Sequence, residues 1–128
     1  MGFVRPRLLL ATLLAASFAC AGGRTSRRRD VDRSVITQDQ LHEHRFSNAF
    51  EAVEALRGNW LQTHGTDSFT TPSQVWVYLD NTKLGGVESL RSIEVAPIVF
   101  IRHFDGLSAT ARWGLDHGAG VIFVSTHR

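Results

Sequence analysis

The fold class of this chain is decided by Trp113–Arg128, which read WGLDHGAGVIFVSTHR. Gly114, Gly118 and Gly120 predict a turn whose backbone needs positive φ angles. The apolar, β-branched run that follows predicts a strand over Val121–Thr126. A phosphate-binding glycine loop follows a strand and opens a helix, whereas this loop precedes a strand, so the pattern does not predict a dinucleotide site.

Three earlier stretches predict strands that can pair with this one. Gln74–Leu79 carries aromatic and β-branched residues on both faces. Ile98–Phe104 is apolar on both sides at its start, which predicts a central position in a sheet. Ser34–Ile36 is shorter and predicts an edge strand. A tight turn is expected at Asp80–Lys83, where we assign the positive φ angle to Asn81 because Asn tolerates that conformation.

Short helices are predicted between the strands. Thr37 and Gln40 form a capping box that begins a helix ending near His44. Asn48 is placed to cap a second helix, and Gly58 is placed to end it as its C′ residue. The side chains that this second helix is expected to bury on the sheet are Phe50, Val53 and Leu56.

Two further helical segments are shorter. After a break at Gly85 and Gly86, Val87–Ile93 predicts one or two helical turns. Ser108 is placed to cap a helix that Gly114 ends. Together, the elements predict a small α+β domain with a short mixed β-sheet flanked by two or three short helices.

The basic residues concentrate outside this predicted domain. Seven of the 14 Lys/Arg residues precede Ser34. Residues 34–128 hold seven Lys/Arg against ten Asp/Glu, a net charge of −3. A nucleic-acid-binding domain places its positive charge on the folded surface, so nucleic acid is not expected as a partner.

Residues 1–19 have the three parts of a secretory signal peptide. Arg5 and Arg7 give the positive start, and Leu8–Ala16 forms the apolar centre. Ser17-Phe18-Ala19 places small residues at the −3 and −1 positions of a cleavage site. The apolar run is too short to cross a bilayer, so export rather than membrane insertion is predicted.

Cys20 is the only cysteine, which excludes an intrachain disulfide. Its position after the leader resembles a bacterial lipoprotein signal, in which the cysteine is acylated and becomes the mature N-terminus. Ser17 and Phe18 depart from that signal, and ordinary signal peptidase would accept the same stretch. We favour lipidation at Cys20. The resemblance then implies the outer membrane, since Ala21 replaces the Asp that would prevent sorting there; without acylation the protein would be periplasmic.

Residues 20–33 predict an Arg/Gly-rich tether between the leader and the domain. Its Arg27-Arg28-Arg29 run can contact anionic lipid headgroups. A solvated linker without such contacts is the alternative.

Residues 35–128 resemble the plug domain of TonB-dependent outer-membrane receptors. Val77–Asn81 stands where the family has V-x-V-D-G, with Asn in the last position. Ile98–Gly106 corresponds to the family strand I-x-x-I-E-V-x-x-G. Gly118–Thr126 corresponds to the closing segment, and Trp113 takes the place of the usual Tyr. The closing segment is the most specific of the three.

The resemblance implies a plug-like fold and a partner at the outer membrane, such as a barrel. A plug sits inside a barrel that 128 residues are too few to include, so energy-coupled transport by this chain alone is not expected. We expect a non-enzymatic interaction module that docks through residues 62–73 and 84–88, which correspond to ligand-facing loops in the family. The candidate binding residues there are Thr66, Asp67, Ser68, Phe69, Gly85 and Gly86.

A periplasmic carrier of a small ligand, such as an iron complex or a glycan, is the alternative function. A hydrolase is not expected, because the sequence fixes no acid, base and nucleophile together. No cofactor or metal is expected either. His42 and His44 point apart on a helix, and His103, His117 and His127 lack the spacing of a zinc site.

Overall fold

The computed structural model describes Gly2, residues 32–63 and residues 73–128. The described chain is built on one five-stranded mixed sheet in the order β1-β4-β5-β2-β3. β2 pairs with β5 in parallel, and the other neighbouring strands pair antiparallel. The strands are β1 (Val35–Thr37), β2 (Trp76–Leu79), β3 (Thr82–Gly85), β4 (Phe100–Phe104) and β5 (Val121–Ser125).

This sheet confirms the predicted fold class, a small α+β domain with a short mixed sheet. β1 lies at an edge and β4 lies inside the sheet, both as predicted. β3 was not predicted from the sequence, and Thr82 and Lys83, which were expected in the tight turn, are its first two residues. Lys83 and Gly85 are weak strand formers, and this strand pairs on one side only, so its sequence carries little strand signal.

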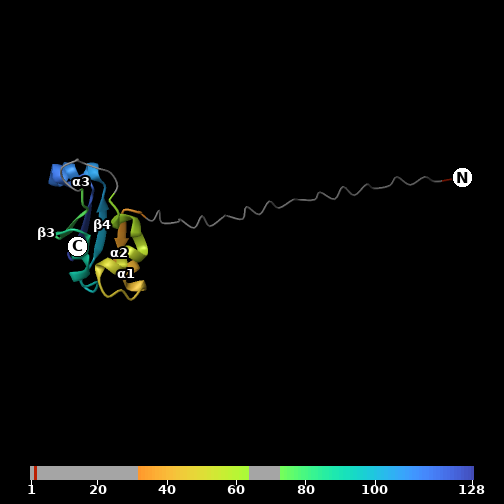
Figure 1. Cartoon of the computed structure of the whole chain (residues 1–128). Coiled ribbons are helices and arrows are strands. Elements are labelled where there is room, and N and C mark those ends of the chain that lie inside the picture. The colour runs from red at the N-terminus through yellow and green to blue at the C-terminus, as the bar shows by residue number, and fades with distance from the viewer. Residues whose placement is uncertain (1, 3–31, 64–72) are drawn as a thin grey trace.

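Three α-helices and three short 3-10 helices lie within the described residues. α1 and α2 lie beside each other against the sheet, and α3 lies at one end of it (Figure 1). The bounds are α1 (Gln38–Glu43), α2 (Ala49–Arg57), η1 (Gly58–Leu61), η2 (Val87–Ser92), α3 (Gly106–Trp113) and η3 (Leu115–His117).

Both predicted N-terminal caps of the first two helices are confirmed. The backbone N–H of Gln40 donates to Oγ1 of Thr37 at 3.4 Å, and the Thr37 N–H donates to Oε1 of Gln40 at 3.1 Å. The Glu51 N–H donates to Oδ1 of Asn48 at 3.0 Å. These bonds satisfy N–H groups that a helix leaves without partners in its first turn.

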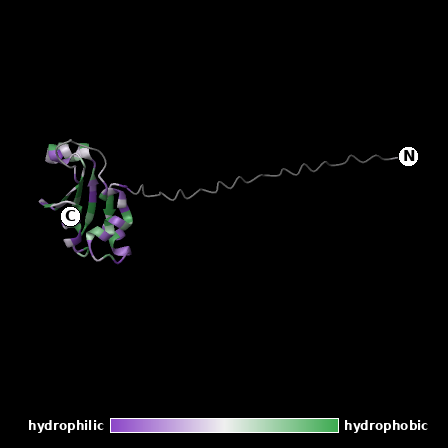
Figure 2. Cartoon of the chain, viewed as in Figure 1, coloured by the Kyte–Doolittle hydropathy of each residue, from purple (hydrophilic) through white to green (hydrophobic). Residues whose placement is uncertain are grey.

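The main core lies between one face of the sheet and the helices α1, α2, η1 and η2. Phe50 and Val53 are buried there as predicted, and Leu56 is partly buried. The central strands carry mostly hydrophobic colour in Figure 2, whereas α1 and α2 carry both colours. The strand residues that supply this core are Ile36, Val77, Ile101, Ile122 and Val124.

Two helix ends differ from the prediction. Asp105, not Ser108, caps α3, because its carboxylate accepts the Ser108 N–H at 2.7 Å and the helix therefore begins at Gly106. Gly58 is not a left-handed C′ residue. Its φ of −53° is helical, so the chain continues from α2 directly into η1.

The turns also correct two predictions. Asp80, not Asn81, holds the positive φ angle, at 52°. Gly114 and Gly120 have the predicted positive φ, at 105° and 101°, but Gly118 has a helical φ of −62°. The backbone of Gly118 instead packs closely against Gly106, since a Cβ on Gly106 would collide with the carbonyl of Gly118.

Candidate functional site

The second face of the sheet carries the candidate site. Side chains alternate between faces along a strand, so Trp76 and Tyr78 of β2 and Phe123 of β5 share one face. Phe100 and Phe104 of β4 join them through its register with β5. Tyr78 is buried, whereas the other four rings are half-buried. We define the open face as these four rings, Trp76, Phe100, Phe104 and Phe123, with the exposed cations Lys83, Arg102 and Arg112.

The rings of the open face contact one another across the strands. Phe123 lies 6.2 Å from Phe100 and 6.5 Å from Phe104, measured between ring centroids. Trp113 of α3 packs edge-on against Phe104 at 5.1 Å. α3 thus covers one end of this face, where Ala109 is buried against Tyr78 and Val121. The described residues place no other α-helix in this cluster.

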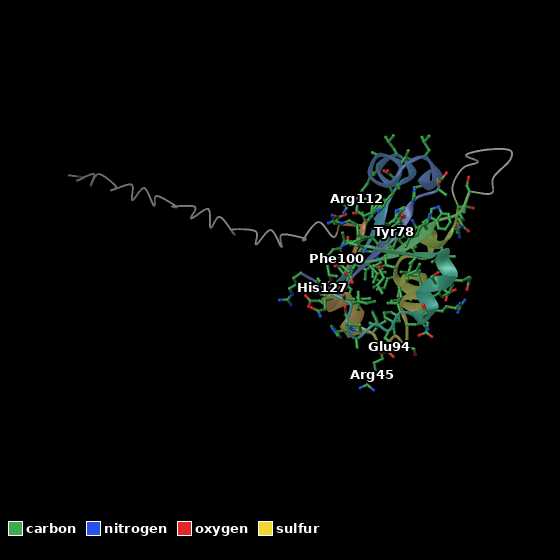
Figure 3. All side chains as sticks on the ribbon, turned by 90° about the vertical axis from the view of Figure 1, so that its left-hand side faces the viewer. Arg45, Tyr78, Glu94, Phe100, Arg112 and His127 are labelled. Carbon is green, nitrogen blue, oxygen red and sulfur yellow. The ribbon has the colours of Figure 1, made fainter. Side chains whose placement is uncertain are left out.

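Three cations lie against these rings, and the guanidinium carbon of Arg102 is 5.9 Å from the Phe100 ring centre. The Arg112 guanidinium carbon is 4.9 Å from the Trp113 ring centre and 5.8 Å from that of Phe123. The Lys83 ammonium is 3.5 Å from the Trp76 ring centre. Each arrangement is within the range of a favourable cation–π contact. In Figure 3, Arg112 and Phe100 lie along one side of the molecule and Tyr78 lies further inside.

The carboxylates at the margin of the open face are held by hydrogen bonds within the chain. The side-chain and backbone bonds from Ser34 lower the pKa of Asp32. The backbone N–H of Ser108 lowers the pKa of Asp105. Asp116, on η3, is exposed, and its backbone oxygen accepts the Trp76 Nε1–H at 2.8 Å. The cations of the open face therefore contact aromatic rings, and these carboxylates lie only at the margin of this face.

Asp80 connects the β2–β3 turn to the residues after β5. Its carboxylate accepts the Thr126 N–H at 2.9 Å and the Thr126 hydroxyl at 2.8 Å. The backbone N–H of Thr126 is the main cause of a lowered pKa at Asp80. This confirms the prediction of a turn at Asp80 and gives the residue a structural role.

Tyr78 and His117 form a buried pair beneath α3. The Tyr78 hydroxyl and His117 Nε2 are 2.9 Å apart, and His117 Nδ1 is 3.3 Å from the carbonyl oxygen of Gly114. A carbonyl only accepts, so Nδ1 carries a proton, and in the neutral imidazole Nε2 then accepts from the hydroxyl. Burial raises the pKa of Tyr78. The pair satisfies polar groups inside the fold rather than facing a substrate.

A shallow groove lies elsewhere on the molecule. Arg33, Arg57, Asn59 and Trp60 line a volume of about 380 Å³. Arg57 Nε donates to the Arg33 carbonyl at 3.3 Å, and its Nη1 donates to the Leu56 carbonyl at 2.7 Å. The groove thus offers guanidinium groups to a ligand, and the buried Trp60 lies at its base.

The structure describes only two of the six predicted binding residues, Gly85 and Gly86. Thr66, Asp67, Ser68 and Phe69 lie outside the described residues, as do Met1, residues 3–19 and Cys20. Gly85 ends β3 with a φ of 145°, and Gly86 precedes η2. A Cβ on Gly85 would lie 2.9 Å from Ser89 Oγ, so close packing accounts for this glycine.

Two searches of the described residues bear on function. No group of three or more His, Cys, Asp or Glu side chains there could hold a metal ion. None of the helices formed by residues 32–63 and 73–128 is long and apolar enough to cross a membrane.

Comparison with known proteins gives no relative. No protein-family model, curated protein or solved structure matches the chain. The plug resemblance therefore rests on the sequence motifs alone.

The sequence interpretation missed the open face. The signal was present as Phe100-x-Arg102-x-Phe104 in β4 and as Trp76-x-Tyr78 in β2. Alternate positions of a strand share a face, so each pattern predicts a ring-bearing surface. The sequence analysis noted aromatic and β-branched residues on both faces of Gln74–Leu79 but did not separate the two faces.

Proposed function

We propose that this chain is a non-enzymatic binding module of the bacterial cell envelope with a plug-like domain. In this proposal residues 1–19 direct export, acylated Cys20 anchors the protein at the periplasmic face of the outer membrane, and the domain docks on an outer-membrane barrel or another envelope protein. The open face is the docking surface. The proposal includes no catalytic residue, cofactor or metal.

The open face supports docking through its composition. Aromatic residues and arginine are enriched at the centres of protein interfaces, where they supply large contact areas and directional hydrogen bonds. Here four half-buried rings lie in one sheet face beside Arg102 and Arg112. The three cations would meet carboxylates on the partner, since Arg pairs with carboxylates through two parallel hydrogen bonds. This surface is the observation that carries the proposal.

Photo-crosslinking in the native envelope tests the docking surface. A photoreactive residue at Arg102, on the open face, is expected to capture one dominant envelope protein. The matched control is the same residue at Glu54, which is exposed on α2 on the other side of the sheet. Equal capture from both positions, or capture from Glu54 alone, would contradict the proposal.

Acylation of Cys20 is tested by a separate fractionation experiment. Cys20→Ser is expected to move the protein from the membrane fraction to the soluble periplasmic fraction. Ala21→Ser is the control, because it leaves the cysteine in place. Retention of the Cys20→Ser protein in membranes would contradict lipidation without affecting the docking surface.

A small-ligand carrier is the second candidate, and the groove favours it. Its volume of about 380 Å³ is within the usual range of ligand pockets. Arginine binds anionic groups, which iron complexes and acidic glycans carry. A ligand at a hundredfold excess over its Kd would stabilise the fold by about 2.7 kcal/mol. Thermal melting with ferric siderophores and acidic glycans tests this, with Arg57→Ala losing the effect and Arg91→Ala keeping it.

A further inference from the structure

Two leucines at one end of the molecule are almost fully exposed. Leu107 of α3 has 85% of its surface accessible, and Leu115 of η3 has 89%. Among the described residues, Leu84 is the only other large hydrophobic side chain classed as exposed, at 38%. We name α3 and η3, residues 106–117, the tip.

The tip holds these leucines on a rigid support. Asp105 caps the start of α3, and the Gly114 N–H donates to the Thr110 carbonyl at its end, at 2.9 Å. The His117 N–H then donates to the Gly114 carbonyl at 3.2 Å. Gly106 packs directly on the backbone of Gly118, so the two helices are fixed against each other. Both leucines therefore extend from ordered backbone into solvent.

The tip lies at the end of the sheet where the chain from Cys20 enters the domain. The His103 N–H donates to the Ser34 carbonyl at 2.8 Å, and Val35 pairs with Arg102. Since β4 continues through Phe104 into α3, the start of β1 and the tip share one end of the sheet. Thirteen residues joined in a chain span at most about 45 Å. An anchor at Cys20 would thus hold this end near the bilayer.

We infer that the tip is a membrane-contact site at which Leu107 and Leu115 enter the interfacial region of the bilayer that holds the Cys20 anchor. The inference rests on the anchor in the proposed function, and it adds a contact that the docking surface does not include. Exposed apolar side chains bind the boundary between headgroups and acyl chains. Arg27, Arg28 and Arg29 before the domain add attraction to anionic headgroups.

A membrane fits these leucines better than a protein partner or a second copy of the chain. A stable protein interface buries about 800 Å² on each side, which two projecting side chains do not supply. A bilayer has no fixed shape, so it accepts separate apolar side chains. The exposed Asp116 beside Leu115 stays in water and limits the depth of insertion. Such contact is weak alone and becomes effective with a second anchor.

Vesicles coupled to Cys20 test the inference. The mature chain, residues 20–128, has one thiol, so a maleimide lipid attaches it at the anchor position. The vesicles contain phosphatidylethanolamine and phosphatidylglycerol with brominated acyl chains, which quench nearby tryptophan fluorescence. Trp113 lies at the end of α3 and Trp76 donates to the backbone of η3, so both report on the tip, whereas Trp60 is buried in the main core. We expect stronger quenching than in matched vesicles without bromine.

Leu107→Ser/Leu115→Ser is expected to lose most of this quenching, and the matched control Leu84→Ser is expected to keep it. Slower hydrogen exchange of amides 106–117 in the coupled wild-type chain than in the free chain is the second expected result, and it needs no variant. Equal quenching with and without bromine, unchanged exchange on coupling, or undiminished quenching in the double variant would each overturn the inference. Chemical coupling makes the result independent of acylation in cells, which the Cys20→Ser fractionation reports separately.

Discussion

The two faces of the sheet are built from the same strands but differ in the type and burial of their side chains. The face toward α1 and α2 is sealed by aliphatic side chains, and Ile101, Ile122 and Val124 have no accessible surface. The open face has half-buried rings and exposed cations. Neighbouring residues of one strand, such as Ile122 and Phe123, therefore lie on opposite faces of the sheet. The first face supplies the fully buried core, and we propose that the second face serves recognition.

Charge separates the two sides as well. α1 and α2 carry Asp39, Glu43, Glu51 and Glu54 against the single arginine Arg57. The open face carries three cations, with carboxylates only at its margin. The domain's net charge of −3 does not reveal this separation of acidic and basic residues between the two sides. The net charge of a domain therefore does not give the charge of the one surface that contacts a partner.

The largest expected effect tests the difference between the two faces directly. Ile101→Ala removes a side chain with no accessible surface from the main core, so the free energy of unfolding should fall by about 3 kcal/mol. Arg102→Ala changes the next residue of β4, on the open face, and should change it by less than about 0.5 kcal/mol. Urea denaturation measures both. Similar losses would show that both faces contribute equally to stability.

A second substitution removes the partial cover of the open face. Gly106→Ala places a Cβ against the carbonyl of Gly118, so α3 must move away from η3 at a cost of about 2 kcal/mol. Acrylamide should then quench tryptophan fluorescence more strongly, because Trp113 loses its packing. Ala111→Ser, exposed on the same helix, is the control. An unchanged melting temperature in Gly106→Ala would refute the close approach.

The third effect concerns the link between Asp80 and Thr126. The folded state lowers the pKa of Asp80 below its ordinary value of 3.8. Its stabilisation is therefore fully present above that ordinary pKa and is lost as the pH falls through the lower, folded-state pKa. Asp80→Asn keeps a residue that tolerates positive φ and should cost about 1 kcal/mol at neutral pH. Unfolding free energies of both proteins from pH 7 to pH 2, roughly the span in which such carboxylates titrate, should converge at the acid end; parallel curves would exclude this role.

The smallest effect on stability belongs to the cation above the rings. Arg112→Ala removes cation–π contacts worth about 0.5 kcal/mol at an exposed site. Binding of the crosslinked partner should weaken by about tenfold, because a charged contact at the interface is lost. Arg91→Ala, on η2, is the matched control. Binding unchanged by Arg112→Ala would remove the open face from the docking model.

The sequence predicted the fold where one physical signal dominated. The capping box at Thr37 and the Asn48 cap are local, and the apolar runs of β4 and β5 have few alternatives. The prediction failed where two residues compete for one role. Asp105 and Ser108 are both good caps, and only the backbone path selects Asp105.

The candidate site was harder to predict, because it depends on contacts between distant residues. Arg112 meets Phe123 only after α3 packs against the sheet. The exposure of Leu107 and Leu115 likewise follows from the position of the tip, since leucine in a short helix normally predicts burial. The alternation of side chains along a strand could have predicted that the rings share one face. It could not have predicted that cations from other elements contact these rings.

The central place of β5 has a consequence for biogenesis. β1 and β4 form one antiparallel pair, β2 and β3 form another, and only β5 joins the two pairs. β5 follows the other four strands along the chain, so a polypeptide that emerges N-terminus first lacks its middle strand until residue 125 is available. The sheet cannot close during synthesis of the preceding strands. In the export that we propose, such a delay would keep the chain competent for passage through a secretion channel in the unfolded state.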